Sequence, residues 1–352
     1  MTLTVHSGRA GKARPDVDMA VDLAGLELPN PITTASGCAA AGRELGQFFD
    51  VSAIGAVVTK SIMLNPRSGR PTPRMAETPS GMLNSIGLQG PGIDAFLEHD
   101  LPWLADRGAR AVVSIAGGAV EDYAKLASKL RGAPALAAIE ANISCPNVED
   151  RGQVFACNAG AAATVIQAVK RAAPTGVPVF AKLSPDVTDI VSIAESVMSA
   201  GADGLSMINT LLGMVIDPTT MRPLLGGLTG GLSGPAIRPV AVRCIWQVHQ
   251  AMPDVPIIGM GGVRTGLDAL ELMLAGASAV SVGTITFNDP SAPMRILREL
   301  EEALAERGFS HARDAVGFAH RPALPKPLEL TDEDGEVIDD FAQPVAIDLE
   351  EH

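Results

Sequence analysis

A cysteine stands between two asparagines in the segment Asn142-Ile-Ser-Cys-Pro-Asn147, directly after an apolar run at residues 136–141. Carboxamides both donate and accept hydrogen bonds in one plane, which suits a flat heterocycle with alternating C=O and N–H groups. The thiol of Cys145 can exchange a proton with a molecule held there. The alternative is a proline-containing turn in which Asn and Ser cap the next helix. The hexapeptide alone does not separate a catalytic loop from a capped turn.

Two lysines, Lys60 and Lys182, end otherwise apolar runs. A lysine in such a place is costly unless its ammonium meets an anion. We therefore expect both lysines to face a ligand that carries or develops negative charge. The alternative is an ammonium that reaches the solvent at the rim through its flexible stem.

Glycines cluster after two late apolar runs, in Gly259-Met-Gly-Gly262 and in Val282-Gly-Thr284. Backbone N–H groups in such turns can hold a phosphate group. Glycine turns are common, so each cluster alone is a weak signal. The two clusters follow the last two of the eight apolar runs that are described below. Taken together, they favour a phosphate site.

The elements that position these residues follow one pattern, in which a short run rich in Val, Ile and Ala is followed by a segment of helical periodicity. Eight continuous apolar strands separated by helices imply a parallel sheet covered on both faces, and hence a (β/α)8 TIM barrel of the α/β class. A doubly wound sheet is the competitor, but residues 33–38 lack the G-x-G-x-x-G fingerprint. The apolar runs are residues 31–36, 54–60, 109–116, 136–144, 177–184, 204–209, 255–262 and 277–284, and the clearest helices are expected at 190–200, 237–252 and 267–275.

In a barrel, the residues that end the strands meet on one face, where the active site lies. The strand ends expected there are Ser36, Lys60, Ser114, Asn142, Cys145, Lys182, Asn209, Gly261, Gly262, Gly283 and Thr284. We therefore expect one site that combines the cysteine, the lysines and the glycine turns.

Composition narrows the function. The 352 residues are 47% hydrophobic but only 3% aromatic, and the net charge is −13, which argues against binding to nucleic acid. The four cysteines lack C-x-x-C spacing and the histidines lack paired helical spacing, so we predict no metal site. We find no signal-like segment and no run of about 18 apolar residues, and we predict a cytoplasmic protein without a membrane segment.

Several short motifs occur in one order along residues 23–290. They are Thr34-Ala-Ser-Gly37, Val58-Thr-Lys-Ser61, Asn84-Ser-Ile-Gly-Leu88, Asn142–Asn147, Phe180-Ala-Lys-Leu183, Ile208-Asn-Thr210, Leu232-Ser-Gly234, Gly261-Gly262 and Gly283-Thr284. Together these motifs resemble the class 1 dihydroorotate dehydrogenases, flavin enzymes of pyrimidine synthesis. The segment Ile86–Gly92 is similar to the B-type subfamily, whose catalytic subunit passes electrons to a second subunit that carries FAD and an iron-sulfur cluster.

The resemblance implies FMN as the cofactor and dihydroorotate and orotate as substrate and product. It implies FMN contacts at Ser36, Lys60, Ser61, Asn142, Lys182, Ile208, Gly234, Gly261, Gly262, Gly283 and Thr284. It implies substrate contacts at Lys60, Asn84, Ser85, Ile86, Gly87, Leu88, Asn142, Asn147, Asn209 and Thr210. Ser114 departs from the pattern, since B-type relatives commonly have asparagine there, which leaves a flavin contact at Ser114 open.

The implied reaction is the oxidation of dihydroorotate to orotate in the de novo synthesis of UMP. Cys145 would remove the C5 proton as general base, and the C6 hydride would pass to flavin N5. Lys60 would bridge flavin and substrate, and Lys182 would stabilise the anion of the reduced ring. The residue chemistry agrees, because a carbon acid beside a carbonyl needs a base, and nearby cations favour a thiolate.

We predict three regions, a polar N-terminal segment at residues 1–18, an FMN-binding barrel at 19–317 and an acidic, proline-containing tail at 318–352. A homodimer is expected, with or without an FAD and iron-sulfur subunit. The electron acceptor is NAD through that subunit or fumarate, and the subtype motif favours NAD. The alternatives are a related flavin barrel that acts on uracil-like rings and a non-catalytic, phosphate-binding barrel subunit.

Overall fold

The computed structural model describes residues 16–144 and 155–322. The chain divides into two compact units, residues 1–318 and 319–352. Cys145, Asn147 and most of both predicted terminal regions lie outside the described residues. The boundaries of the three predicted regions stay predictions.

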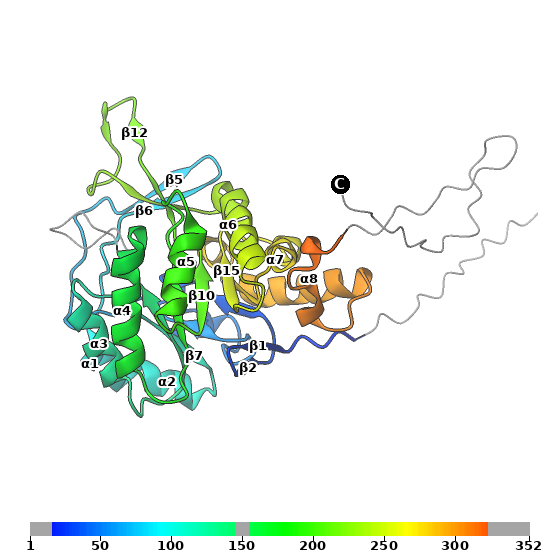
Figure 1. Cartoon of the computed structure of the whole chain (residues 1–352). Helices are drawn as coiled ribbons and strands as arrows, with labels where there is room; N and C mark the ends of the chain where they lie inside the picture. The colour runs from blue at the N-terminus through cyan, green and yellow to red at the C-terminus, as the bar shows by residue number, and fades with distance from the viewer. Residues whose placement is uncertain (1–15, 145–154, 323–352) are drawn as a thin grey trace, which may run out of the picture. The chain divides into compact units, whose positions relative to one another are not determined.

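Eight short parallel strands form a barrel in the first unit, and each lies within one of the eight predicted apolar runs (Figure 1). All residues of seven strands are buried, and in the eighth only positions 136 and 137 are partly exposed. Burial on both faces explains why these strands are apolar without alternation. The predicted (β/α)8 barrel is confirmed. In sheet order the strands are β3 (Ile32–Thr34), β16 (Ala279–Val282), β15 (Ile257–Met260), β10 (Gly204–Met207), β9 (Val179–Lys182), β8 (Leu136–Asn142), β7 (Ala111–Ile115) and β4 (Val57–Val58).

Side chains complete the seam where β3 and β4 close the barrel. Thr33 and Ala56 form an isolated parallel bridge. The hydroxyl of Thr34 donates to the carbonyl of Val58 at 3.1 Å and accepts from its N–H at 2.9 Å. The buried carboxamide oxygen of Asn30 accepts a backbone N–H from each side of the seam. These bonds replace ladder bonds that the two-residue strand β4 cannot supply.

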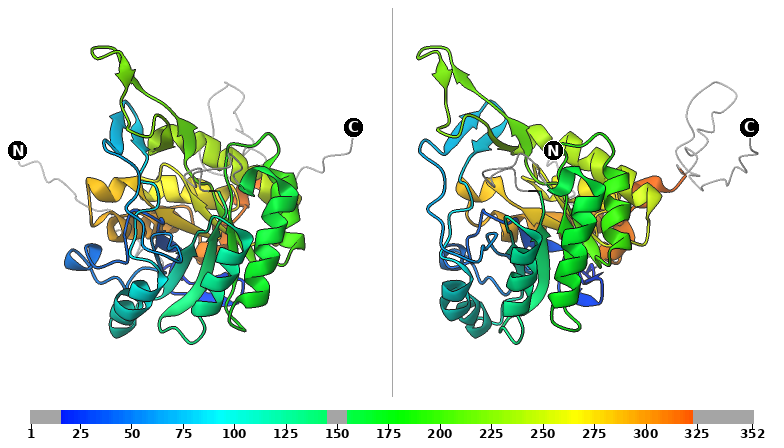
Figure 2. Two further views of the ribbon diagram at one scale, coloured as in Figure 1. Left: turned by 90° about the vertical axis from the view of Figure 1, so that its left-hand side faces the viewer. Right: turned by 60° about the vertical axis from the view of Figure 1, so that its left-hand side comes forward.

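Helices cover the outside of the barrel between successive strands (Figure 2). The helices predicted at residues 190–200, 237–252 and 267–275 are confirmed as α5, α6 and α7. None of the helices in the described ranges has the length and apolar character needed to span a bilayer. The helices are α1 (Ile93–Ala95), α2 (Leu101–Asp106), α3 (Val120–Lys129), α4 (Ala159–Ala172), α5 (Ile190–Ser199), α6 (Arg238–Ala251), α7 (Gly266–Leu274) and α8 (Ala292–Glu306), with a π-helical turn at Phe96–Asp100 and 3-10 turns at Leu45–Gln47, Phe155–Cys157, Pro235–Ile237, Thr284–Phe287, Ala312–Ala315 and Phe318–His320.

Polar caps fix where three of these helices begin. The side chain of Asn158 accepts the backbone N–H of Ala161 at the start of α4. Asp189 caps α5 in the same way, and Thr265 caps α7 in a reciprocal pair with Asp268. Each cap satisfies an N–H group that has no partner within its helix, and so sets the point at which the chain leaves the preceding loop.

A second, antiparallel sheet lies over the carboxyl ends of the barrel strands (Figure 2). The apolar runs of the sequence do not reveal this sheet, because its strands are short and three of the four contain glycine. Its strands, in sheet order, are β11 (Leu211–Gly213), β14 (Gly230–Ser233), β6 (Gly81–Asn84) and β5 (Met75–Thr78). Two separate hairpins pair β1 (Val21–Leu23) with β2 (Leu26–Leu28) and β12 (Ile216–Asp217) with β13 (Arg222–Pro223).

Helices α7 and α8 approach most closely at Gly266. A Cβ added there would lie 2.3 Å from backbone atoms of Glu299 and Leu300. We expect Gly266→Ala to lower the free energy of unfolding by about 1–3 kcal/mol, because the two helices would have to separate. Gly160, in the first turn of α4, is the matched control, since its added Cβ would meet nothing closer than 3.5 Å. Urea unfolding checks both variants, and equal effects would contradict the close packing at Gly266.

Candidate active site

A cavity of about 640 Å³ opens at the carboxyl ends of the barrel strands, under the antiparallel sheet. Its size lies in the range of roughly 300–1,000 Å³ that is usual for cofactor and small-molecule sites. Every predicted site residue that the structure describes lines it, except Ser85 and the strand-end residue Ser114. The predicted residues in the lining are Ser36, Lys60, Ser61, Asn84, Ile86, Gly87, Leu88, Asn142, Lys182, Ile208, Asn209, Thr210, Gly234, Gly261, Gly262, Gly283 and Thr284.

Ser85 and Ser114 are fully buried and do not line the cavity. The hydroxyl of Ser85 accepts a hydrogen bond from Arg70 at 3.4 Å, so its side chain faces away from the cavity. The hydroxyl of Ser114 pairs with that of Ser61 at 2.8 Å inside the barrel. Ser114 therefore contacts the cavity lining indirectly, through the hydroxyl of Ser61.

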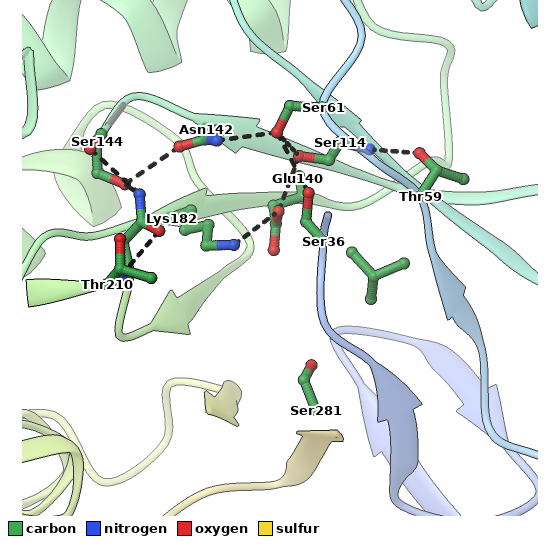
Figure 3. A network of polar contacts seen from close by, with 12 residues as sticks. Ser36, Thr59, Ser61, Ser114, Glu140, Asn142, Ser144, Lys182, Thr210 and Ser281 are labelled. Carbon is green, nitrogen blue, oxygen red and sulfur yellow. Dashed lines mark hydrogen bonds and ion pairs between the residues drawn. The ribbon is translucent and has the colours of Figure 1, made fainter. Parts of the chain in front are cut away.

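The end of strand β8 is tied to the end of β10 through Ser144 (Figure 3). The carboxamide of Asn142 donates to Ser61 Oγ at 2.9 Å and accepts from Ser144 Oγ at 3.2 Å. The carboxamide of Asn209 donates to Ser144 Oγ at 2.7 Å. The hydroxyl of Tyr123 donates to the carbonyl of Asn142 at 2.8 Å and holds the strand from the side of α3. The chain is therefore anchored at the residue before the predicted base.

A buried ion pair lies behind the lining of the cavity, between Lys182 Nζ and Glu140 Oε1 at 3.6 Å (Figure 3). The side chains are 5% and 0% exposed. Ser114 donates to the same carboxylate oxygen at 2.9 Å, and the hydroxyl contacts continue through Ser61 to Ser36. Glu140 was not among the predicted site residues. The only sequence signal for it is a single acid inside an apolar run.

A second cysteine, Cys38, shares the cavity with Lys60 and Lys182. Burial raises the pKa of the Cys38 thiol to about 11, and the opposing effect of the two ammonium groups is smaller. The thiol therefore keeps its proton at neutral pH and is unsuited to act as a base. No sequence signal places Cys38 in the cavity, because it follows the first strand within an ordinary turn.

One end of the cavity is built from glycine backbone. Gly234, Gly261 and Gly262 have φ angles of +90°, +136° and +73°, which side chains rarely tolerate. A Cβ on Gly262 would lie 2.9 Å from the carbonyl oxygen of Gly234, and one on Gly261 would lie 2.7 Å from the Cβ of Ala241. The hydroxyl of Thr284 lies beside this backbone. Bare backbone and a hydroxyl suit a phosphate group, as the glycine clusters predicted.

Comparison with known proteins decides the family. The family model for dihydroorotate dehydrogenase matches residues 18–304. The chain belongs to the dihydroorotate dehydrogenase family. The predicted activity, oxidation of dihydroorotate to orotate in pyrimidine biosynthesis, is that of this family, whose members depend on flavin in general.

Its curated relatives carry a more specific name, "Dihydroorotate dehydrogenase B (NAD(+)), catalytic subunit". The relative from Geotalea daltonii is 50% identical over 305 residues, which are 87% of this chain and 98% of that protein. The relative from Pelobacter propionicus is 51% identical over 85% of this chain and 98% of that protein. The relative from Geobacillus kaustophilus is 50% identical over 85% of this chain and 95% of that protein. The predicted resemblance to the B-type family members is thereby confirmed.

The buried thiol of Cys38 leads to a prediction about alkaline pH. Its pKa in the folded protein, about 11, exceeds the ordinary value of 9.0 that applies to the unfolded chain. Between these values the unfolded chain has lost a proton that the folded protein keeps, so the free energy of unfolding must fall as pH rises. Because the thiol is only partly shielded from water in the cavity, about 3 kcal/mol is an upper limit.

Urea unfolding at pH 8 and pH 10 measures this loss. We expect Cys38→Ala to lose less stability than the wild type over that interval. Parallel losses in the two proteins would show that the Cys38 thiol titrates normally.

Proposed function

We propose that this chain is the catalytic subunit of a B-type dihydroorotate dehydrogenase that binds FMN in the cavity. One observation carries the proposal. The same cavity has glycine backbone at one end, two carboxamides held by Ser144 at another part of its wall, and Lys60 and Lys182 in its lining. This combination suits a phosphate, a flat ring that takes up negative charge, and a pyrimidine.

The residues fit FMN. Gly234, Gly261, Gly262, Gly283 and Thr284 would hold its phosphate through backbone N–H groups and a hydroxyl. Ser36, Ser61, Asn142, Lys182 and Ile208 would contact the ring system, as the sequence predicts. When bound, FMN supplies the chemistry of accepting a hydride from carbon. The ammonium of Lys182 would stabilise negative charge on the ring system, because it is buried and water screens it only weakly.

The substrate would be held by a set of carboxamides. Asn84, Asn142, Asn209 and the hydroxyl of Thr210 line the cavity and offer donors and acceptors to a pyrimidine edge. Lys60 offers a positive charge to the carboxylate of dihydroorotate. Asn147, predicted to join this set, lies outside the described residues. The backbone of residues 85–88 completes the predicted substrate contacts, although the side chain of Ser85 points away.

Cys145 would remove the proton from C5 of dihydroorotate. It follows Ser144, which Asn142 and Asn209 hold on two sides, so the backbone before the thiol is fixed. The positive charges of the two lysines in the cavity favour a thiolate. Among the described residues, Cys38 is the cysteine that lines the cavity, and its raised pKa makes it a poor base.

The first functional prediction separates the two cysteines. We expect Cys145→Ala to keep its flavin but to slow reduction of the flavin by dihydroorotate by about 10²–10⁴-fold, because the proton acceptor is lost. Cys38→Ala, the matched control, should stay within about threefold of wild type. Anaerobic stopped-flow bleaching of the flavin measures both. Near-wild-type bleaching in Cys145→Ala would remove Cys145 from the base role, and dihydrouracil in the same assay tests the requirement for a carboxylate.

The second functional prediction concerns the electron acceptor. The relatives are named catalytic subunits of NAD⁺-linked enzymes, and we propose that here too a partner subunit with FAD and an iron-sulfur cluster delivers the electrons to NAD. We expect the chain alone to reduce a dye with dihydroorotate but not NAD, and the complex purified from its native host to form NADH. NADH formation by the chain alone, or fumarate reduction, would overturn this assignment. The homodimer and the cytoplasmic location stay predictions.

A further inference from the structure

Glu140 is a charged group with no role in the mechanism above. It lies in β8, its side chain is fully buried, and it does not line the cavity. One carboxylate oxygen contacts Lys182 at 3.6 Å and Ser114 at 2.9 Å. The other oxygen, Oε2, is buried without a hydrogen-bond partner among the described residues. A carboxylate in this position destabilises the folded protein unless it is paired, because a buried charge loses its hydration.

The strand register explains how Glu140 meets the lysine. In the parallel pair of β8 and β9, Asn142 lies opposite Lys182, and Glu140 lies opposite Phe180. Residues two apart on a strand share a face, so Glu140, Asn142 and Lys182 all point into the barrel. Asn142 and Lys182 line the cavity, whereas Glu140 lies one step deeper. The carboxylate therefore sits behind the ammonium as seen from the cavity.

The electrostatic field that Lys182 exerts in the cavity therefore depends on Glu140. Each ion of the pair would be strongly unfavourable in the interior without the other. The other titratable groups that act on this region include Lys60, which is also positive, and the Cys38 thiol, which keeps its proton. Within the described ranges, the carboxylate of Glu140 is the negative group in ion-pair contact with Lys182. It offsets part of the lysine's field at short range, where screening by water is weak.

We propose that Glu140 is a positioning residue that holds the Lys182 ammonium against the cavity and sets the reduction potential of the bound flavin. The inference rests on the proposed FMN site. Lys182 stabilises the reduced, anionic ring, and Glu140 limits that stabilisation. The reduced cofactor thereby keeps enough free energy to pass its electrons to an acceptor, which a subunit that relays electrons requires.

Ser114 supplies a second way to alter the same carboxylate. Its hydroxyl donates to Glu140 Oε1 at 2.9 Å and does not touch the cavity. A hydrogen bond to a charged group is stronger than one between neutral groups. Loss of this bond leaves the charge of Glu140 in place but loosens its position, so the effect on the flavin should have the same direction and a smaller size.

The test measures the midpoint potential of the FMN-loaded chain by anaerobic equilibration with a reference dye. Glu140→Gln is the main variant, because it removes the charge and keeps the shape. We expect its two-electron reduction equilibrium to shift at least tenfold toward reduced flavin, which corresponds to about 30 mV more positive. Ser114→Ala should shift in the same direction by less, and Lys182→Gln in the opposite direction.

The outcomes separate this inference from a structural role and from the proposed function. If Glu140 only stabilises the fold, Glu140→Gln lowers the free energy of unfolding while the retained flavin keeps its wild-type potential, and the inference is wrong. If Glu140→Gln does not fold, an unchanged potential in Ser114→Ala overturns it. Failure of the wild type to bind FMN, or to be reduced by dihydroorotate, contradicts the proposed function instead.

Discussion

The structure depends on the closure of a sheet whose strands are very short. Eight strands of two to seven residues leave little backbone for pairing, and an open edge would expose unpaired N–H and C=O groups. Closure removes the edge, but the seam at β4 has too few residues to form a full ladder. Thr34 and Asn30 supply the missing donors and acceptors with their side chains. The strand ends, and with them the cavity, are fixed in space because this seam holds.

The interior of the barrel contains polar residues that lower the stability of the fold. Most strand residues are small and apolar, yet near the cavity Ser114, Glu140 and Lys182 occupy positions that Val or Ile would fill with less penalty. Each contacts a neighbour on an adjacent strand, and the polar groups form one connected set with Ser61 and Asn142 (Figure 3). Their places on strands, rather than loops, make the charges of the cavity rigid.

Much of this arrangement could be predicted from the sequence. Strands buried on both faces are continuous apolar runs, so all eight were visible, and barrel topology then brings distant residues such as Lys60, Asn142 and Lys182 to one face. Other features were not accessible. The antiparallel sheet has strands of three or four residues with glycine, which carry no clear period. The partner of Glu140 depends on the register between two strands, and the direction of the Ser85 side chain depends on Arg70, which lies 15 residues earlier in the chain.

The hydrogen bonds of Ser144 limit how the specificity of this cavity can evolve. In the proposed function Asn142 and Asn209 would offer their carboxamides to the ligand, and the same two groups hold Ser144, just before Cys145. A substitution at either asparagine therefore alters recognition and the placement of the catalytic segment together. The antiparallel sheet supplies another part of the lining, and among the described residues its side chains form no hydrogen bond with Ser144. A single substitution in that sheet can therefore change the ligand preference alone. A substitution of Asn142 or Asn209 would change the ligand preference and also lower the rate of turnover.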